Sequence, residues 1–335
     1  MIKYNRQLLI NSANELGFTN VVNDSDEYLI ELFNHAANWI RGKEPKRLPC
    51  CPPPEKHPYL DLCPIDPEFK KYIIGTFPPI TYQSDLFIDI QFCNGKRVSI
   101  PQLPFYHGNR QMLWQYLLSE QLYSVLSEDR LERRNQIINY LNENRINYAD
   151  VISFCQRAEY NADDANLFNI ILNQQLLEIA TRKSDEEILL VFNTGSLFTA
   201  RGLKYYRNGK INTSSFVFDM FIALVVEAGI EVQIQFLNEQ PILINYSNRN
   251  ILAQYNNIIR FDIYLNGKRI KIVAGPSPAN GDGQLQNNSI YQRFERIFYR
   301  NNNLAIGEIK KKFKQYVYRT ALLGNCDELY QLNRD

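Results

Sequence analysis

The sequence predicts an α/β protein of three layers, in which a short, mainly parallel central sheet lies between helices on both of its faces. Three short apolar runs, at 71–76, 188–193 and 269–275, are bounded by loop signals, as buried parallel strands are. Segments with helical spacing of apolar residues separate them, and this alternation is typical of an open parallel sheet. The chain has 335 residues, 45% of them hydrophobic, so a large core can form.

Three regions follow from the composition along the chain. Residues 1–48 carry apolar residues at helical spacing and predict a helical N-terminal extension. Residues 49–69 are rich in proline, which excludes regular helix and interior strand, so this segment is either an extended linker or a strap lying over the core. Residues 70–335 are expected to form the main domain, with an insertion at about 203–268 that contains a β-hairpin.

The remaining elements follow from periodicity and turn signals. Apolar spacing predicts helices starting near Gly108 and at 128–144, 216–228, 288–299 and 308–320. A further helix, capped by Asp163 or Asp164, is expected to reach about Thr181. Short strands are expected at 150–152 and 231–236, and the Asn-Gly pairs at 94–95 and 266–267 predict two hairpins.

Charge and composition limit the partners and the compartment. The formal net charge is +1, so the molecule has no overall basic field, and DNA contacts would need a local patch of Lys and Arg. No apolar run approaches about 20 residues, and the N-terminus lacks the layout of a signal peptide, so no membrane span is expected. Six cysteines, mostly scattered, indicate free thiols in a reducing compartment. We expect a cytoplasmic monomer.

Two further groups of residues have a functional and a plainer interpretation. Cys50, Cys51, His57 and Cys63 could suggest a metal, but their spacing matches no standard zinc or cluster pattern, so we expect no metal and no cofactor. The basic residues of the last helix could contact DNA phosphates, although a solvated helix end is the favoured interpretation. These residues are Lys310, Lys311, Lys312, Lys314 and Arg319.

Four segments place polar and aromatic residues after predicted strands or at a helix start. They are Gly75–Pro79, Phe105–Trp114, Asp150–Arg157 and Gly275–Gly281. Ligands of open α/β sheets bind outside the carboxyl ends of the strands, so we expect these segments to line one cleft. Each segment alone is equally compatible with an ordinary turn or helix start.

The order of these segments resembles that of the uracil-DNA glycosylase superfamily, most closely its hypoxanthine/uracil and mismatch-specific branches. The matching residues are Gly75 to Pro78, then Tyr106, Gly108, Asn109 and Trp114, then Asp150 to Arg157 with Asp163, then Asn193-Thr194-Gly195, and last Pro276-Ser277-Pro278. The resemblance covers residues 71–200 and 270–300, and leaves the N-terminal extension and the insertion outside it.

The resemblance implies a uracil-DNA glycosylase-like fold and an enzyme that flips a damaged or deaminated base, uracil or hypoxanthine, out of DNA and hydrolyses its N-glycosidic bond. The implied catalytic residues are Asn109 and Asp150, either of which would position the attacking water. The implied substrate-binding residues are Gly75, Thr76, Phe77, Pro78, Phe105, Tyr106, Asn193, Ser277, Pro278 and Asn280. Phe77, Phe105 or Tyr106 would stack on the base, and the loop from Ser277 to Asn280 would hold phosphates or enter the gap that the base leaves.

Two positions depart from the family pattern. Many branches have Asp or Asn where this chain has Phe77, and several have His where it has Gly275. These departures predict weak excision, restricted to good leaving groups. Two other hypotheses stay open: a catalytically silent member that binds DNA or a nucleotide, and an α/β binding protein unrelated to DNA.

Overall fold

The computed structural model describes residue 10 and residues 55–78, 105–106, 112–157, 167–182, 187–193, 203–207, 210–214, 217–236, 239–244, 258–278, 282–300 and 304–333. The helical extension predicted for 1–48, apart from Ile10, and the hairpin predicted at 94–95 lie outside the described residues.

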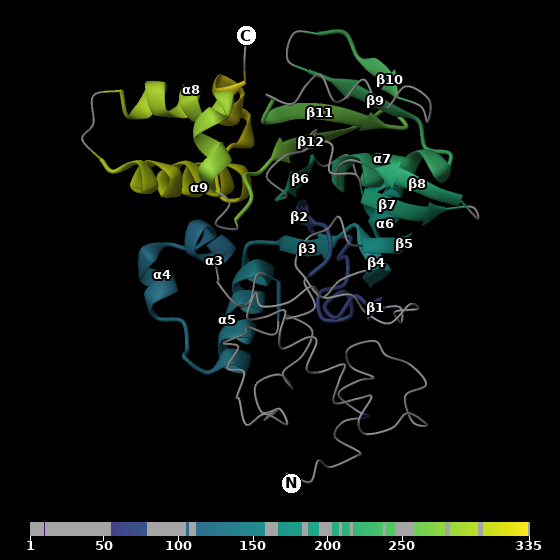
Figure 1. The fold of residues 1–335 in the computed structure, drawn as a ribbon, viewed down its shortest axis with the longest axis horizontal. Helices are drawn as coiled ribbons and strands as arrows, with labels where there is room; N and C mark the ends of the chain where they lie inside the picture. The colour runs from purple at the N-terminus through teal and green to yellow at the C-terminus, as the bar shows by residue number, and fades with distance from the viewer. Residues whose placement is uncertain are drawn as a thin grey trace.

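A seven-stranded sheet forms the centre of the molecule, in the order β10-β9-β11-β12-β6-β2-β3 (Figure 1). Its strands are β2 (Lys71–Gly75), β3 (Ile146–Asp150), β6 (Ile188–Phe192), β9 (Val232–Gln235), β10 (Ile242–Ile244), β11 (Arg260–Leu265) and β12 (Lys268–Ala274). The four neighbours β12, β6, β2 and β3 run parallel, whereas β9, β10 and β11 pair antiparallel. The prediction that 71–76, 188–193 and 269–275 form neighbouring parallel strands is confirmed.

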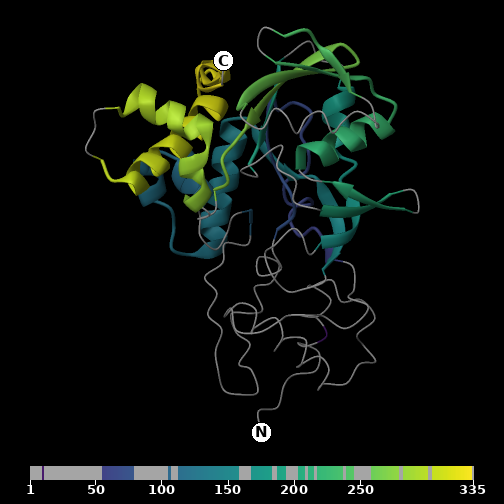
Figure 2. The ribbon, with the colours of Figure 1, turned by 45° about the horizontal axis from the view of Figure 1, so that its top comes forward.

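Alternate residues of the parallel strands enter two separate hydrophobic cores. In β6, Ile188, Leu190 and Phe192 belong to one core, while Leu189 and Val191 belong to the other. Because side chains of a strand alternate between faces, this division places helices on both sides of the sheet. Figures 1 and 2 show α6 and α7 on one side and α3, α5, α8 and α9 on the other.

The helices of the two layers are short to medium in length. On the first face lie α6 (Leu176–Thr181) and α7 (Val217–Glu227), and α7 ends before Gly229, whose φ of 77° suits glycine. The second layer contains α3 (Met112–Leu117), α4 (Glu120–Ser124), α5 (Arg130–Glu143), α8 (Ser289–Phe298) and α9 (Ile306–Leu322). Two 3₁₀ segments, Asp282–Asn287 and Cys326–Leu332, flank α8 and α9. No helix in the described ranges has the length and apolarity that crossing a membrane requires.

The described part of the proline-rich segment is a strap packed on the domain. Its strand β1 (Glu55–Lys56) pairs with β4 (Ile152–Arg157), which also pairs with β5 (Leu167–Leu172) in a small antiparallel sheet. His57, Tyr59, Leu60 and Ile65 of the strap are buried. Of the two expectations for this region, the strap holds for residues 55–69.

The helix expected from Asp163 or Asp164 to Thr181 is wrong over most of its length. Leu167–Leu172 is strand β5, and only Leu176–Thr181 is helical. The run LFNIIL is apolar and contains isoleucines, so local spacing does not separate strand from helix. Pairing with β4 decides for the strand, and Asn173 then begins the turn into α6, in which the Leu176 N–H bonds to Asn173 O at 3.2 Å.

The segment 203–268 is built into the sheet. It holds the hairpin of β7 (Leu203–Arg207) and β8 (Lys210–Ser214), the buried helix α7, and three strands, β9, β10 and β11, that extend the central sheet. The predicted hairpin at 266–267 is confirmed between β11 and β12, with φ of 48° at Asn266 and 80° at Gly267.

The basic residues of α9 are not a uniform exposed face. Lys310 and Lys314 are buried, and the Lys314 Nζ lies 5.3 Å from the centre of the Tyr116 ring. Arg319 donates to the backbone oxygens of Tyr116 and Leu118. Lys314 and Arg319 therefore help to fix α9 against α3 and the residue after it, and Lys310 is buried, so neither a five-residue DNA patch nor a fully solvated end describes the five cations.

The centre of the sheet carries the stability of the domain. Leu190 in β6 has no exposed surface, whereas Leu243 in the edge strand β10 is 52% exposed. We expect Leu190→Ala to lower the free energy of unfolding by about 2–5 kcal/mol, because it removes buried methyl groups and leaves a cavity. Leu243→Ala should change it by less than about 0.5 kcal/mol. Urea unfolding followed by circular dichroism measures both, and equal losses would contradict the assignment of β6 to the core.

Candidate active site at the carboxyl edge of the parallel strands

The strand order locates the crevice in which a ligand of this fold would bind. The chain forms β2 first, adds β3 on one side of it, and then returns to add β6 and β12 on the other side. Ligands of open α/β sheets bind outside the carboxyl ends of the strands at such a switch point. Here that point lies between Gly75 at the end of β2 and Asn193 after β6, whose backbone N–H bonds to Ile74 O at 3.0 Å.

Gly75 is a position at which no side chain fits. The parallel register of β2 and β3 places Gly75 opposite Asp150. A Cβ atom on Gly75 would lie 2.2 Å from Asp150 Oδ1 and 3.2 Å from Asn193 Oδ1. The glycine therefore permits a carboxylate and an amide to meet above the end of β2.

Asp150 is paired with a histidine from the strap. His57 Nε2 lies 2.9 Å from Asp150 Oδ2, and both side chains are buried. The backbone N–H of Tyr59 donates to His57 Nδ1 at 3.1 Å, so this nitrogen carries no proton and the Nε2–H donates to the carboxylate. Asn173 adds a further bond from its Nδ2 to the Asp150 backbone oxygen at 3.1 Å.

Two polar atoms of this site have no partner in the described part of the chain. Asp150 Oδ1 makes no hydrogen bond there, although Asp150 is only 3% exposed. The hydroxyl of Tyr106 is fully buried and also unpartnered. Burial, and secondarily the charge of Asp150, raises the pKa of Tyr106 well above its usual value, so the phenol stays protonated. An unpaired buried polar group is costly, so the Tyr106 hydroxyl points to a ligand or water, and the Asp150 Oδ1 atom beside it is open to accept a hydrogen bond.

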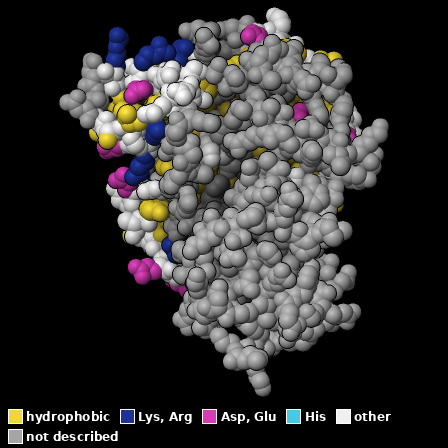
Figure 3. Space-filling view, in the orientation of Figure 1, with side chains coloured by type: hydrophobic (Ala, Val, Ile, Leu, Met, Phe, Trp, Pro, Cys, Tyr) yellow, Lys and Arg dark blue, Asp and Glu magenta, His cyan; other side chains and the backbone are white. Residues whose placement is uncertain are grey.

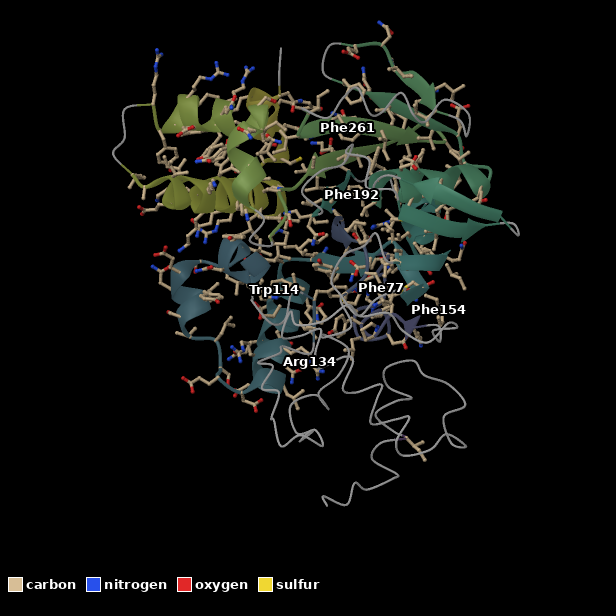
Figure 4. The ribbon with its side chains drawn as sticks, in the orientation of Figure 1. Phe77, Trp114, Arg134, Phe154, Phe192 and Phe261 are labelled. Carbon is tan, nitrogen blue, oxygen red and sulfur yellow. The ribbon has the colours of Figure 1, made fainter. Side chains whose placement is uncertain are left out.

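Aromatic rings surround the pair. Tyr106 stacks on Tyr148 with ring centres 3.8 Å apart, and Phe77 meets the His57 ring edge-on at 5.2 Å. Tyr148 also accepts a hydrogen bond from Asn193 Nδ2. Figure 4 labels Phe77, which follows the end of β2, together with Trp114 of α3 and Phe154 of β4. The site thus combines one carboxylate, the hydroxyls of Tyr106 and Tyr148, the amide of Asn193 and several flat apolar faces.

This arrangement can hold and polarise a water molecule. One carboxylate oxygen is bound by His57, which fixes the orientation of the group, and the other oxygen is open to accept a proton. The aromatic surroundings exclude bulk water and so strengthen electrostatic interactions at the carboxylate. The chemistry that fits is proton abstraction from water beside a flat, weakly polar ligand.

The structure brings together several of the residues expected to form the site. Gly75, Thr76, Phe77, Asp150 and Asn193 lie at the ends of β2, β3 and β6, and Thr76 O accepts from Ile152 N at 3.2 Å. Pro78 follows as a buried residue, and Tyr106 meets His57 with ring centres 5.5 Å apart. Phe105 has no exposed surface and stacks on Trp114, which places it in the core rather than in the site. Asn109 and Asn280 lie outside the described residues.

The Pro-Ser-Pro loop begins at the same edge of the sheet but farther along it. The Gly275 N–H bonds to Phe192 O at 2.7 Å, so Ser277 and Pro278 follow the strand on the far side of β6. Two strand spacings, about 10 Å, separate the ends of β12 and β2. A side chain at 275 would be crowded, because a Cβ there would lie 3.0 Å from Phe192 O and 3.2 Å from Tyr318 Cε1. Tyr318 takes that space and donates to Pro276 O at 2.5 Å.

Sequence reasoning missed His57 and Tyr148 as site residues. His57 is one of three histidines in the chain, but it was weighed only as a metal ligand beside Cys50, Cys51 and Cys63. Of those cysteines the structure describes Cys63, whose Sγ accepts from Asn147 Nδ2 and whose pKa is raised by burial. In the described ranges, no three His, Cys, Asp or Glu side chains come together to hold a metal ion. The scarcity of histidine was the available signal.

Comparison of the chain with protein-family models, with curated proteins and with solved structures finds no match. The interpretation of the site therefore depends on its own residues.

The close approach at Gly75 has a measurable consequence. Gly75→Ala forces Asp150 to move, and we expect a loss of about 1–3 kcal/mol in the free energy of unfolding, as is usual for overpacking. Gly307→Ala is the matched control, because nothing lies within 4 Å of its added Cβ and the residue sits in the first turn of α9. That variant should be neutral or slightly stabilised. Denaturant unfolding compares the two, and an unchanged Gly75→Ala protein would contradict the contact.

Proposed function

We propose that this protein is a DNA glycosylase-like hydrolase that flips a damaged or deaminated base, such as uracil or hypoxanthine, and hydrolyses its N-glycosidic bond. The observation that carries the proposal is the open Oδ1 of the buried Asp150, which lies over the side-chain-free end of β2 and is backed by His57. The order of motifs that resembles the uracil-DNA glycosylase superfamily supports the same substrate class.

The reaction needs little from the protein beyond positioning and electrostatics. As the bond between the base and C1′ breaks, positive charge develops on the sugar and negative charge on the base. A water held at Asp150 Oδ1 adds to C1′ and passes a proton to the carboxylate; the departing base anion takes up a proton from solvent, and the carboxylic acid then releases its own proton to solvent. The carboxylate also stabilises the sugar cation, because opposite charges attract strongly in a site with little water.

Asp150 can hold the attacking water, which the phenyl ring of Phe77 cannot do. Many branches of the superfamily have Asp or Asn where this chain has Phe77, two residues after Gly75. Because Asp150 lies level with Gly75 in the neighbouring parallel strand, its carboxylate reaches the same edge of the sheet. We therefore assign the water to Asp150 rather than to Asn109, which the sequence offered as the other candidate.

Stacking and one hydroxyl would recognise the flipped base. Extrusion of a base costs a few kcal/mol of stacking and pairing, which aromatic contacts and hydrogen bonds to the base edge offset. Phe77 and Tyr106 pack on the ring of His57, the partner of Asp150, and Tyr148 stacks on Tyr106, so a base that entered beside them would meet aromatic rings. The buried Tyr106 hydroxyl, unpartnered among the described residues, would gain a bond to the base.

Phosphate contacts require locally placed cations, since the net charge is only +1. Figure 3 shows Lys and Arg side chains gathered over the corner formed by α8 and α9. Arg296 and Arg300, at the end of α8 and just after it, are exposed there. Few such contacts predict DNA binding with a shallow dependence on salt.

The test is excision of single bases from oligonucleotides that carry uracil, hypoxanthine, xanthine or mismatched thymine, followed by cleavage of the abasic sites. We expect slow excision of uracil or hypoxanthine. Asp150→Asn should lower the single-turnover rate by about 10²–10⁴-fold, the usual contribution of a positioned base. Asp61→Asn is the control, because Asp61 lies on the strap with its side chain 72% exposed, and should excise normally.

The other outcomes separate the alternatives. Normal excision by Asp150→Asn with loss in Asn109→Ala would move the water to Asn109. An unmutated protein that binds DNA but excises none of the four bases would be the silent member of the superfamily. A protein that does neither would belong to the class of α/β binding proteins unrelated to DNA, and the proposal would be overturned.

A further inference from the structure

We propose that His57, carried by the strap at 55–69, is the positioning residue of the active site, which holds Asp150 so that its Oδ1 faces the attacking water. This inference rests on the proposed function. It makes the strap part of the active site, although the strap precedes the strands of the sheet and lies outside every motif that resembles the glycosylase superfamily.

The hydrogen bonds of the imidazole define one tautomer. Nδ1 accepts the backbone N–H of Tyr59 at 3.1 Å, and Nε2 faces Asp150 Oδ2 at 2.9 Å. A ring with its proton on Nδ1 would oppose the Tyr59 N–H and would leave two acceptors, Nε2 and Oδ2, facing each other. The neutral ring with its proton on Nε2 satisfies both contacts, so His57 acts as a fixed hydrogen-bond donor.

The ring is held from all sides by described residues. The backbone N–H of His57 bonds to Ser153 O at 2.8 Å, which continues the pairing of β1 with β4. Tyr59 and Phe77 meet it edge-on, with ring centres at 5.9 Å and 5.2 Å, and Tyr106 lies against it at 5.5 Å. His57 is 1% exposed, so a change of rotamer would require the surrounding side chains to move.

A fixed donor at one oxygen sets the direction of the other. His57 is the side-chain partner that the described residues give to the Asp150 carboxylate, and Oδ1 then lies above Gly75. Without His57 the Asp150 carboxylate would lose the side-chain donor that binds its Oδ2, and the group would turn toward any available donor or water. The water would lose its acceptor, whereas the aromatic surfaces that bind the base would remain.

The experiment separates positioning from folding. In His57→Leu the donor is lost, and we expect the single-turnover rate of uracil excision to fall about 10- to 100-fold, by analogy with the loss of hydrogen-bond partners of metal ligands. The dissociation constant for the same DNA should stay within about twofold. His57→Gln, whose side-chain amide can donate to Oδ2, should recover most of the rate. Lys56→Gln, next to it on the exposed side of the strap, should excise normally.

A double mutant shows whether His57 acts through Asp150. Residues that act as one unit are not additive, so His57→Leu should lower the rate no further in an Asp150→Asn background. If His57→Leu lowered the excision rate of Asp150→Asn by the same factor as in the unmutated protein, His57 would have a role independent of Asp150, and the inference would be overturned. The ¹⁵N shifts of His57 in the unmutated protein should show a protonated Nε2 and a bare Nδ1, and the reverse would also overturn it.

The failure of this inference differs from the failure of the proposed function. If the unmutated protein excises no base, the proposed function fails and the positioning role fails with it. If the unmutated protein excises uracil and folded His57→Leu does so at the same rate, only the role of His57 fails. Thermal midpoints of the variants exclude misfolding, and His57→Gln gives the answer if His57→Leu does not fold.

Discussion

The register between β2 and β3 is the constraint on which the rest of the site depends. It sets Gly75 opposite Asp150, and the missing side chain at 75 lets the carboxylate lie across the end of β2. β2 is hydrogen-bonded on both sides, to β3 and β6, so a shift in register would break two ladders and reverse the faces of the strand. The position of Asp150 is therefore fixed by the backbone of the sheet rather than by a loop.

Burying a carboxylate at that point requires a compensating donor. His57 supplies it, and the strap that carries His57 is held in turn by its own buried apolar residues, Tyr59, Leu60 and Ile65. The strap thus has two roles. Its apolar side chains add buried surface, and its imidazole offsets part of the cost of burying the Asp150 carboxylate. The buried Tyr106 hydroxyl, which has no hydrogen-bond partner among the described residues, is a remaining cost in stability beside this carboxylate.

The far end of the parallel sheet is fixed by a different set of interactions. Arg260 in β11 is fully buried and pairs with Asp262 and Asp327, while Lys271 in β12 also reaches Asp327. These contacts tie the hairpin to the segment Cys326–Leu332, and Tyr318 of α9 holds the backbone of Pro276. The start of the Pro-Ser-Pro loop is thereby held at the edge of the sheet, and the crowding at Gly275 explains why a histidine has no room there.

The sequence by itself determined three of the four parallel strands, β2, β6 and β12, together with the buried helix α7 and the hairpin at Asn266-Gly267, because each depends on a local pattern of apolar residues or on a turn that needs positive φ. The fourth parallel strand, expected at 150–152, is β3 at Ile146–Asp150. The sequence also placed Gly75, Asp150 and Asn193 at strand ends. Tertiary structure alone decided that Leu167–Leu172 is a strand. The apolar residues of this run fit both a helix and a strand, and only the pairing with β4 decides between the two. The inward direction of Lys314 and Arg319 depends likewise on what packs against α9. The contact of His57 with Asp150 joins residues 93 positions apart, and no local pattern encodes which distant side chains the path of the chain brings together.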